Sequence, residues 1–544
     1  MADLNVNGNQ GNGGCKIRLF CVNDVHGNFR SYGRLTTAKD TFERQGAQKG
    51  RKTLSFNAGD FFYGTCEKLR NLGVSVMNRL NFTASTIGNH ECDMSKEDLA
   101  QTVERVNSPI ISTNMDTGAV EKTSDDTSVK GTSRKSIVRS QEFMQDGHRF
   151  MIMGLAPREA GVDGVSDKIE DSIQDVNSVI EEARQSGINK IIVVSHMGHE
   201  DNEKIAENCA GVDVIVGGHT HQHLNKDGIV DSADDATGTQ VVRNKKDGAP
   251  VLITEAGKDG HHAVGLDLDF DEQGVIKLNS VDSHVIDVDK AEESSDVKKL
   301  AAENLGEEIT LATVKHGYTA PDEWHDRYQE NPVVNLACDS VLEAGESQGV
   351  EAVLMSTKSI KKGIGDKITT YNIEYDGLMP YNSKFKVVDL TEKELVDLMN
   401  SSSEGIFDGH TVDPDLLRTA GLKVKYEPDA VGDRKPVKSL VLTDKDGKTV
   451  REIDVNNPSD KKVKIAVEES CAKFLGSKEA KGILAPHIQS APVLGKQQDM
   501  MKAYLEKHKE LDLSMAQGDD RRLSFGNTDL NMICTNGQYG KQKA

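Results

Sequence analysis

The sequence predicts an α/β protein with at least two domains, and three observations lead to this prediction. From residue 16 to about residue 289, apolar runs of strand length alternate with polar connections and helix-length segments. A similar alternation resumes after residue 310. The chain has 544 residues, and single hydrophobic cores stop growing well below this length.

Changes in composition set the predicted domain boundaries. Residues 1–15 are polar and rich in glycine, which is typical of a disordered lead. We expect a first domain over residues 16–289, an interdomain helix or linker over 290–309, and a second domain over 310–523. The polar segment 524–544 is predicted to be a frayed tail.

Charge and cysteine content limit the classes of partner and the compartment. The formal net charge of -21 argues against a nucleic-acid polymer or an anionic membrane as partner, because both would repel this surface. Eight cysteines are scattered without a Cys-x-x-Cys pair, so we expect free thiols. With no signal peptide at the start, this favours a cytoplasmic protein. A periplasmic or secreted protein that has lost its signal peptide would look the same. The sequence leaves the oligomeric state open.

Five short motifs carry side chains that can bind metals. They are Asn23–Gly27, Asn57–Asp60, Ser85–Asp93, Ser195–Gly198 and Gly217–His221. Four of them follow apolar runs predicted to be strands: Ile17–Val22, Thr53–Phe56, Ile191–Val194 and Val212–Val216. Ligand sites of open α/β sheets lie at the carboxyl ends of the strands, so we expect the five motifs to meet there.

The residue types in these motifs favour a dimetal centre. Two adjacent divalent cations need about eight ligand positions, including one carboxylate that reaches both ions. Seven side chains provide these positions if Asp60 bridges: Asp24, His26, Asp60, Asn89, His196, His219 and His221. Imidazoles and oxygen donors without thiolates suit Zn, Mn or similar ions. Each motif alone is more often an ordinary turn, but five in one domain are poorly explained by coincidence.

Taken as an ordered set, the motifs resemble a known superfamily. The set Asp24-x-His26, Gly59-Asp60, Gly88-Asn89-His90-Glu91, His196 and Gly218-His219-x-His221 resembles the calcineurin-like metallophosphoesterases. The spacing from Asn89 to Asp93 is similar to that of their 5′-nucleotidase branch. The resemblance implies a four-layer β-sandwich flanked by helices for the first domain. For the second it implies a smaller α/β domain that binds the substrate.

The resemblance also implies a role for each of these side chains. One ion would be held by Asp24, His26, Asp60 and His221, and the other by Asp60, Asn89, His196 and His219. His90 would steady the phosphoryl group or the leaving oxygen, with Asp93 as its partner. His261 and His262, which lie between two late strands, are the best candidates for a supporting shell around the centre.

The second half resembles the substrate domain of that branch less closely. Tyr381 stands where the branch has an aromatic residue that stacks on a base, and Lys361 stands where it has an arginine. Gly476–Ile483 replaces the stretch that carries a second stacking aromatic residue. We therefore predict that Arg327, Ser356, Lys361 and Tyr381 bind the substrate.

These observations predict a metal-dependent phosphomonoesterase of nucleotide catabolism. The reaction would convert a nucleoside 5′-monophosphate to nucleoside and phosphate by in-line attack of metal-bound hydroxide. The same attack could open 2′,3′-cyclic nucleotides or cleave nucleotide sugars, because only the leaving group changes. An alternative of another class is a non-catalytic protein that binds nucleotides or a partner. The complete set of ligands argues against that alternative.

Overall fold

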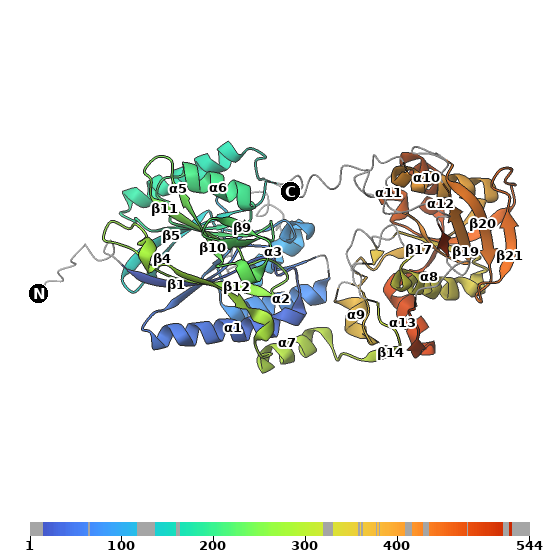
Figure 1. The fold of residues 1–544 in the computed structure, drawn as a ribbon, viewed down its shortest axis with the longest axis horizontal. Coiled ribbons are helices and arrows are strands. Elements are labelled where there is room, and N and C mark those ends of the chain that lie inside the picture. The colour runs from blue at the N-terminus through green and yellow to red at the C-terminus, as the bar shows by residue number, and fades with distance from the viewer. Residues whose placement is uncertain are drawn as a thin grey trace, which may run out of the picture. The chain divides into compact units, whose positions relative to one another are not determined.

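A computed structural model gives the fold of the chain, which divides into two compact units, residues 1–307 and 308–544 (Figure 1). The structure describes residues 15–63, 66–116, 137–158, 164–318, 330–356, 359–360, 363–376, 378–379, 381–407, 416–427, 435–475, 477–514 and 522–524. The predicted lead and tail lie outside these residues, except for Cys15 and Ser524. Every cysteine within them is free, as predicted.

The first unit contains two large sheets. The first has the strand order β13 (Asp282–Asp287), β12 (His262–Asp269), β1 (Lys16–Val22), β2 (Thr53–Asn57) and β3 (Ala84–Ser85). The second has the order β10 (Thr239–Arg243), β11 (Pro250–Thr254), β7 (Val214–Gly217), β6 (Ile191–Ser195), β5 (His148–Leu155) and β4 (Ser140–Gln145). Strands β1, β2 and β3 are parallel, as are β5, β6, β7 and β11. The carboxyl ends of neighbouring strands therefore meet at one edge of each sheet.

Strand β1 shows why these runs fold as buried strands. Ile17, Leu19 and Cys21 point into the core between the two sheets. Phe20 points the other way and packs its ring 5.7 Å from that of Phe42 in helix α1. Apolar groups on both faces are typical of strands covered on both sides. Arg18 is also buried, where it pairs with Asp267.

Helices cover the outer face of each sheet, which makes four layers (Figure 1). Helices α1 (Phe29–Gln48) and α2 (Glu67–Leu80) lie on the five-stranded sheet. Helices α5 (Ile169–Gln185) and α6 (His199–Asn208) pack on the six-stranded sheet through a shared apolar core. The predicted four-layer sandwich is confirmed.

Shorter elements complete the first unit. They are η1 (Glu91–Asp93), α3 (Lys96–Arg105), the hairpin β8 (His223–Asn225) and β9 (Gly228–Val230), η2 (Ala233–Asp235), η3 (Leu278–Ser280), η4 (Val288–Lys290) and α7 (Ser295–Leu305). Helix α7 packs against α1 and α2 within this unit. The segment predicted as one helix over 290–309 is thus a shorter helix that follows a separate 3-10 turn.

The second unit is a smaller α/β structure with three sheets. Their strand orders are β18-β15-β22-β17-β23, β21-β20-β19-β25 and β16-β14-β24. The strands are β14 (Thr310–Val314), β15 (Ala352–Met355), β16 (Lys367–Thr369), β17 (Lys384–Thr391), β18 (Arg418–Ala420), β19 (Leu422–Tyr426), β20 (Val437–Thr443), β21 (Thr449–Ile453), β22 (Lys462–Glu468), β23 (Val493–Lys496), β24 (Glu510–Leu511) and β25 (Leu523–Ser524). The helices are α8 (Pro332–Gly345), η6 (Glu346–Gln348), α9 (Thr370–Glu374), α10 (Glu392–Phe407), α11 (Cys471–Phe474), α12 (Lys478–Ser490) and α13 (Gln497–Lys507).

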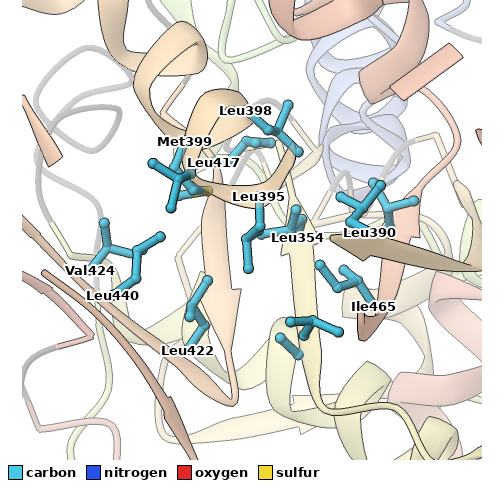
Figure 2. Packing of buried hydrophobic residues seen from close by; sticks show 14 of the residues in the cluster. Leu354, Leu390, Leu395, Leu398, Met399, Leu417, Leu422, Val424, Leu440 and Ile465 are labelled. Carbon is cyan, nitrogen blue, oxygen red and sulfur yellow. The ribbon is translucent and has the colours of Figure 1, made fainter. Parts of the chain in front are cut away.

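A leucine-rich core holds the second unit together (Figure 2). Leu395 and Leu398 of α10 lie over Leu354 of β15 and Ile465 of β22, and all four are buried. The start of α10 is fixed by Thr391 and Glu394. The Glu394 N–H donates to Thr391 Oγ1 (3.1 Å), and the Thr391 N–H donates to Glu394 Oε2 (2.8 Å), which together form a capping box.

The apolar character of the helices is that of a core, not of a bilayer span. Among the residues that the structure describes, no helix has the length and hydropathy needed to cross a membrane.

Replacing Leu354 by Ala should destabilise the second unit by about 2–5 kcal/mol, because a fully buried leucine leaves a cavity. The measurement is the midpoint of urea unfolding of the full chain, followed by circular dichroism. Val450→Ala serves as a control, because Val450 is 65% exposed and its loss should change stability by less than about 0.5 kcal/mol. Equal midpoints for the two variants would contradict the burial of Leu354.

Candidate metal centre

The predicted ligands lie in loops that follow the carboxyl ends of five strands. Asp24 and His26 follow β1, and Asp60 follows β2. The other four ligands follow β3, β6 and β7: Asn89, His196, His219 and His221. Atoms of these side chains contact one another across the two sheets, so the structure brings all seven together.

The backbone of these loops adopts an unusual conformation. Five of the seven residues have a positive φ although none is a glycine: Asp24 (50°), His26 (52°), Asp60 (50°), His219 (83°) and His221 (59°). Such residues cost free energy and persist only where their surroundings fix them. Here the Asp24 N–H donates to Gly59 O (3.1 Å) and the His26 N–H donates to Asp60 O (2.8 Å). Left-handed residues gathered at one place are typical of a functional site.

Each of the two aspartates has one oxygen held by the protein and one turned toward imidazoles. Asp24 Oδ2 accepts from the His219 N–H (2.8 Å) and Asn23 Nδ2 (2.7 Å), whereas Oδ1 lies 3.4 Å from His221 Nε2. Asp60 Oδ1 accepts from the His90 N–H (2.8 Å), whereas Oδ2 lies 3.1 Å from His196 Nε2. The second oxygen of each carboxylate is therefore presented to the centre.

Two imidazoles are oriented through Nδ1, which leaves Nε2 for the centre. His196 Nδ1 donates to Ala58 O (2.6 Å), and His26 Nδ1 contacts Asp259 Oδ1 (3.0 Å). His26 Nε2 lies 3.6 Å from both Asp24 Oδ1 and Asp60 Oδ2. Metal-binding histidines are usually fixed in this way by a partner on the other ring nitrogen.

The donor set fits a divalent cation. Asp24 Oδ1 and His196 Nε2 are buried, and neither has a hydrogen-bond partner among the described residues. Three groups of side chains place one ligand atom each within 4.8 Å of the others: Asp24, His26 and His221; Asp24, Asp60 and His196; and His26, Asp60 and His90. Buried polar atoms without a partner are costly unless they bind an ion.

Asn89 and His219 extend the donor set on the side of His196. Asn89 Oδ1 lies 3.1 Å from His219 Nδ1, and the rings of His219 and His196 are 5.1 Å apart. The seven donors thus form a continuous cluster around the two carboxylates.

Negative charge shifts the protonation of the buried imidazoles. Burial alone would lower the pKa of His196, but the Asp60 carboxylate raises it to about 10. Burial also lowers the pKa of His26, but the contacts of this residue with Asp259 and Asp60 outweigh that effect and raise its pKa to about 9. In the metal-free protein these rings therefore hold protons, which would be released on metal binding.

His90 and Asp93 form the pair expected from the sequence. His90 Nδ1 contacts Asp93 Oδ2 at 2.7 Å, and His90 Nε2 lies 4.0 Å from Asp60 Oδ2. The imidazole is thus oriented by one carboxylate while its other nitrogen faces the centre.

Sequence reasoning gave no role to Glu91, although it lies inside the third motif. Its buried carboxylate accepts from the N–H groups of Asp60 (2.9 Å), Gly88 (2.7 Å) and Phe62 (3.1 Å). Burial raises the pKa of Glu91, and these donors partly offset that effect. Glu91 therefore fixes the loop that carries Asp60.

Two more supporting residues could not be recognised from the motifs. Asp259, which orients His26, lies in the loop that also carries His261 and that leads into β12, whose first residue is His262. His261 instead contacts Asp289 (2.8 Å), and the ring of His262 packs 5.0 Å from that of His223. Glu255 accepts from Thr220 Oγ1 (2.9 Å) and from the Gln222 N–H (2.8 Å), and burial raises its pKa to about 7.

Two of the four predicted substrate residues are described, and both belong to the second unit. The Ser356 N–H donates to Glu468 (3.0 Å), whose buried carboxylate also accepts from Ser359 Oγ (2.5 Å). Tyr381 is 59% exposed. Arg327 and Lys361 lie outside the described residues.

Comparison with known proteins assigns the family. Residues 17–223 match the family model of the calcineurin-like phosphoesterases, which covers most of the first unit. The chain is also similar to the 5′-nucleotidase precursor of Thermus thermophilus, with 22% identity, a TM-score of 0.59, and coverage of 95% of this chain and 100% of that one. The first unit therefore contains a calcineurin-like phosphoesterase domain, and the whole chain shares the fold of the Thermus thermophilus protein.

Curated relatives extend the similarity along both units. The trifunctional nucleotide phosphoesterase YfkN of Bacillus subtilis is 24% identical over 84% of this chain, but the match spans only 31% of YfkN. A snake venom 5′-nucleotidase of Crotalus adamanteus is 25% identical over 76% of this chain and 74% of its own length. The match to the phosphoesterase family model and the donor set of the first unit together indicate a metal-dependent phosphoesterase.

Gly88→Ala should disrupt the centre, because a Cβ at this position would lie 2.0 Å from Asp60 Oδ1. We expect metal affinity to fall by about 100-fold or more, since both Asp60 and its anchor on Glu91 must shift. Metal bound to the purified variant is measured by mass spectrometry. The matched control is Gly482→Ala, where no atom lies within 4 Å of the added Cβ. Full metal content in Gly88→Ala would refute this packing.

Proposed function

We propose that the protein hydrolyses nucleoside 5′-monophosphates to nucleosides and phosphate, with two divalent ions bound by the seven predicted ligands. The observation that carries this proposal is the His90–Asp93 pair beside a complete donor set. The 5′-nucleotidase of Crotalus adamanteus, which is similar over 76% of this chain, supports the choice of substrate.

The ligands divide between the two ions as the family resemblance implies. Asp24, His26 and His221 would hold one ion, and Asn89, His196 and His219 the other. Asp60 would reach both, because its Oδ2 faces both His26 and His196. Such ions lower the pKa of water and neutralise charge on phosphate oxygens. Zn or Mn suits these nitrogen and oxygen donors.

His90 acts on the leaving group in this proposal. Because Asp93 occupies Nδ1, the proton that His90 can donate to the leaving oxygen is carried on Nε2. Asp93 holds the ring in the tautomer and orientation that this transfer needs. A nucleoside leaves as a basic alkoxide, so it gains much from such a proton.

The second unit supplies recognition of the nucleoside and phosphate. Tyr381 is the proposed stacking surface for the base, because a largely exposed aromatic ring can cover a flat ligand. Ser356, Lys361 and Arg327 are the proposed polar contacts. Glu468 supports Ser356 by accepting its backbone N–H.

A second candidate is a broader nucleotide phosphoesterase that acts on 2′,3′-cyclic nucleotides or nucleotide sugars. The similarity to YfkN, a trifunctional nucleotide phosphoesterase, over 84% of this chain favours it. The same donors and His90 would serve both reactions.

A substrate panel separates the two candidates. Phosphate release is measured with AMP, GMP, UMP and 4-nitrophenyl phosphate, and nucleotide products are followed by chromatography with 2′,3′-cyclic AMP and UDP-glucose. Each assay is run with EDTA and then with Mn or Zn restored. We expect the highest kcat/KM with the 5′-monophosphates and no turnover with EDTA. Higher kcat/KM with the cyclic or sugar-linked substrate would favour the second candidate. No turnover of any substrate by the metal-loaded protein would refute both.

Two substitutions separate catalysis from metal binding. His90→Ala should lower kcat for AMP by about 10²–10⁴, the usual contribution of a general acid, and leave the metal content unchanged. Asp60→Asn should lower both the metal content and the activity, because Asp60 is the shared ligand. Metal analysis and kinetics are done on the same preparations. Loss of metal in His90→Ala would argue that His90 is a ligand instead.

A further inference from the structure

Tyr63 lies beside the candidate metal centre and has no role in the proposal above. Its ring centroid is 4.6 Å from that of His90, with the planes at 61°, and 6.1 Å from that of His26, with the planes at 70°. The residue is 38% exposed, although it follows the buried Phe61 and Phe62. Tyr63 thus contacts both an imidazole of the donor set and the imidazole proposed to act on the leaving group.

The segment that carries Tyr63 is fixed from three directions. Phe61 and Phe62 are 0% and 5% exposed and anchor it in the core. The Phe62 N–H donates to Glu91, and the Gly27 N–H donates to Phe61 O (2.9 Å). A Cβ on Gly27 would lie 3.3 Å from Tyr63 N, which shows how closely the two loops approach. The position of the Tyr63 ring is therefore set by the same loops that carry Asp60 and His26.

The ring of Tyr63 restricts the orientation of the His90 imidazole in a way that Asp93 alone cannot. One hydrogen bond to Nδ1 selects the tautomer of His90, but the ring can still tilt about that contact. The side chain of His90 is 26% exposed. An edge-on aromatic contact at 4.6 Å opposes the tilt, because crossed rings prefer this geometry. The imidazole of His90 is thus held by the Asp93 carboxylate at Nδ1 and by the ring of Tyr63, which packs beside it.

We propose that Tyr63 is a positioning residue that holds the imidazole of His90 in the orientation needed to protonate the leaving group. This inference rests on the proposed role of His90. The contact is made by the ring, so phenylalanine should replace tyrosine at this position.

The test compares leaving groups that differ in their need for a proton. Benzyl phosphate releases a basic alkoxide, whereas 4-nitrophenyl phosphate releases a stable phenolate, and neither depends on recognition of a nucleoside. Tyr63→Ala should lower kcat for benzyl phosphate by about tenfold, which is less than the full contribution of a general acid, because His90 is still present. The kcat for 4-nitrophenyl phosphate should change little, because its leaving group needs no proton. KM should stay the same, and Tyr63→Phe should restore kcat.

A double-mutant cycle separates positioning from a general structural effect. If Tyr63 acts through His90, Tyr63→Ala should cause no further loss in a His90→Ala background. Tyr504→Ala is the control, because Tyr504 of α13 also packs on a histidine, its ring stacked 4.1 Å from that of His508, but in the second unit. It should not change the ratio of the two kcat values.

The outcomes distinguish this inference from the function on which it rests. Equal losses on both substrates, or additive losses in the double variant, overturn the role of Tyr63. A leaving-group-dependent loss in His90→Ala but not in Tyr63→Ala also overturns it while the role of His90 stands. A His90→Ala enzyme that loses the same factor on both substrates overturns both. Metal content is measured for every variant, so that loss of the ions is not mistaken for loss of orientation.

Discussion

The structure depends on two buried carboxylates, those of Asp24 and Asp60, each of which presents one oxygen to the centre. Uncompensated charge in a protein interior is costly, and the surrounding loops meet this cost with imidazoles. Without metal, the raised pKa values of His26 and His196 supply the positive charge as protons. Bound cations would take the place of those protons at the same nitrogens. The carboxylates of Asp24 and Asp60 thus need nearby positive charge both in the metal-free and in the metal-bound protein. The backbone at Asp24 and Asp60 keeps its left-handed conformation because hydrogen bonds between the two loops fix it.

Parallel strands make this concentration of charge possible. The ends of β1 and β2 are neighbours in one sheet, and those of β6 and β7 are neighbours in the other, so the four ligand loops begin as two neighbouring pairs. Contacts between distant segments then lock the loops. Asn23, for example, accepts from the Ala256 N–H (2.8 Å) and donates to Gly257 O (2.7 Å). The same loop brings Asp259 to His26. The donors are rigid because their supports come from several elements of the first unit.

The local part of this design could be predicted from the sequence. The predicted runs Ile17–Val22, Thr53–Phe56 and Ile191–Val194 each lie within one residue of an observed strand, because hydrophobic patterns depend on neighbouring residues. The seven ligands could be chosen because metal donors are recognisable by type and by their place after a strand. Asp259 and Glu91 could not be chosen, since a carboxylate in a loop gains its role only from the segment that packs against it. The segment 290–309, predicted as a helix or linker, forms a helix only from Ser295 to Leu305, because the chain before it makes a separate 3-10 turn whose Val288 N–H donates to His261 O.

Catalysis and recognition rest on separate supports in this chain. The carboxylates and imidazoles are held by hydrogen bonds within the first unit, whereas Ser356 is held by Glu468 within the second. Tyr63 belongs with the supports of the centre, because it shares its loop with Asp60 and exposes part of its ring beside His90. On the two proposals, substitution at Tyr63 would act on the chemical step, whereas substitution in the second unit would act on the choice of substrate.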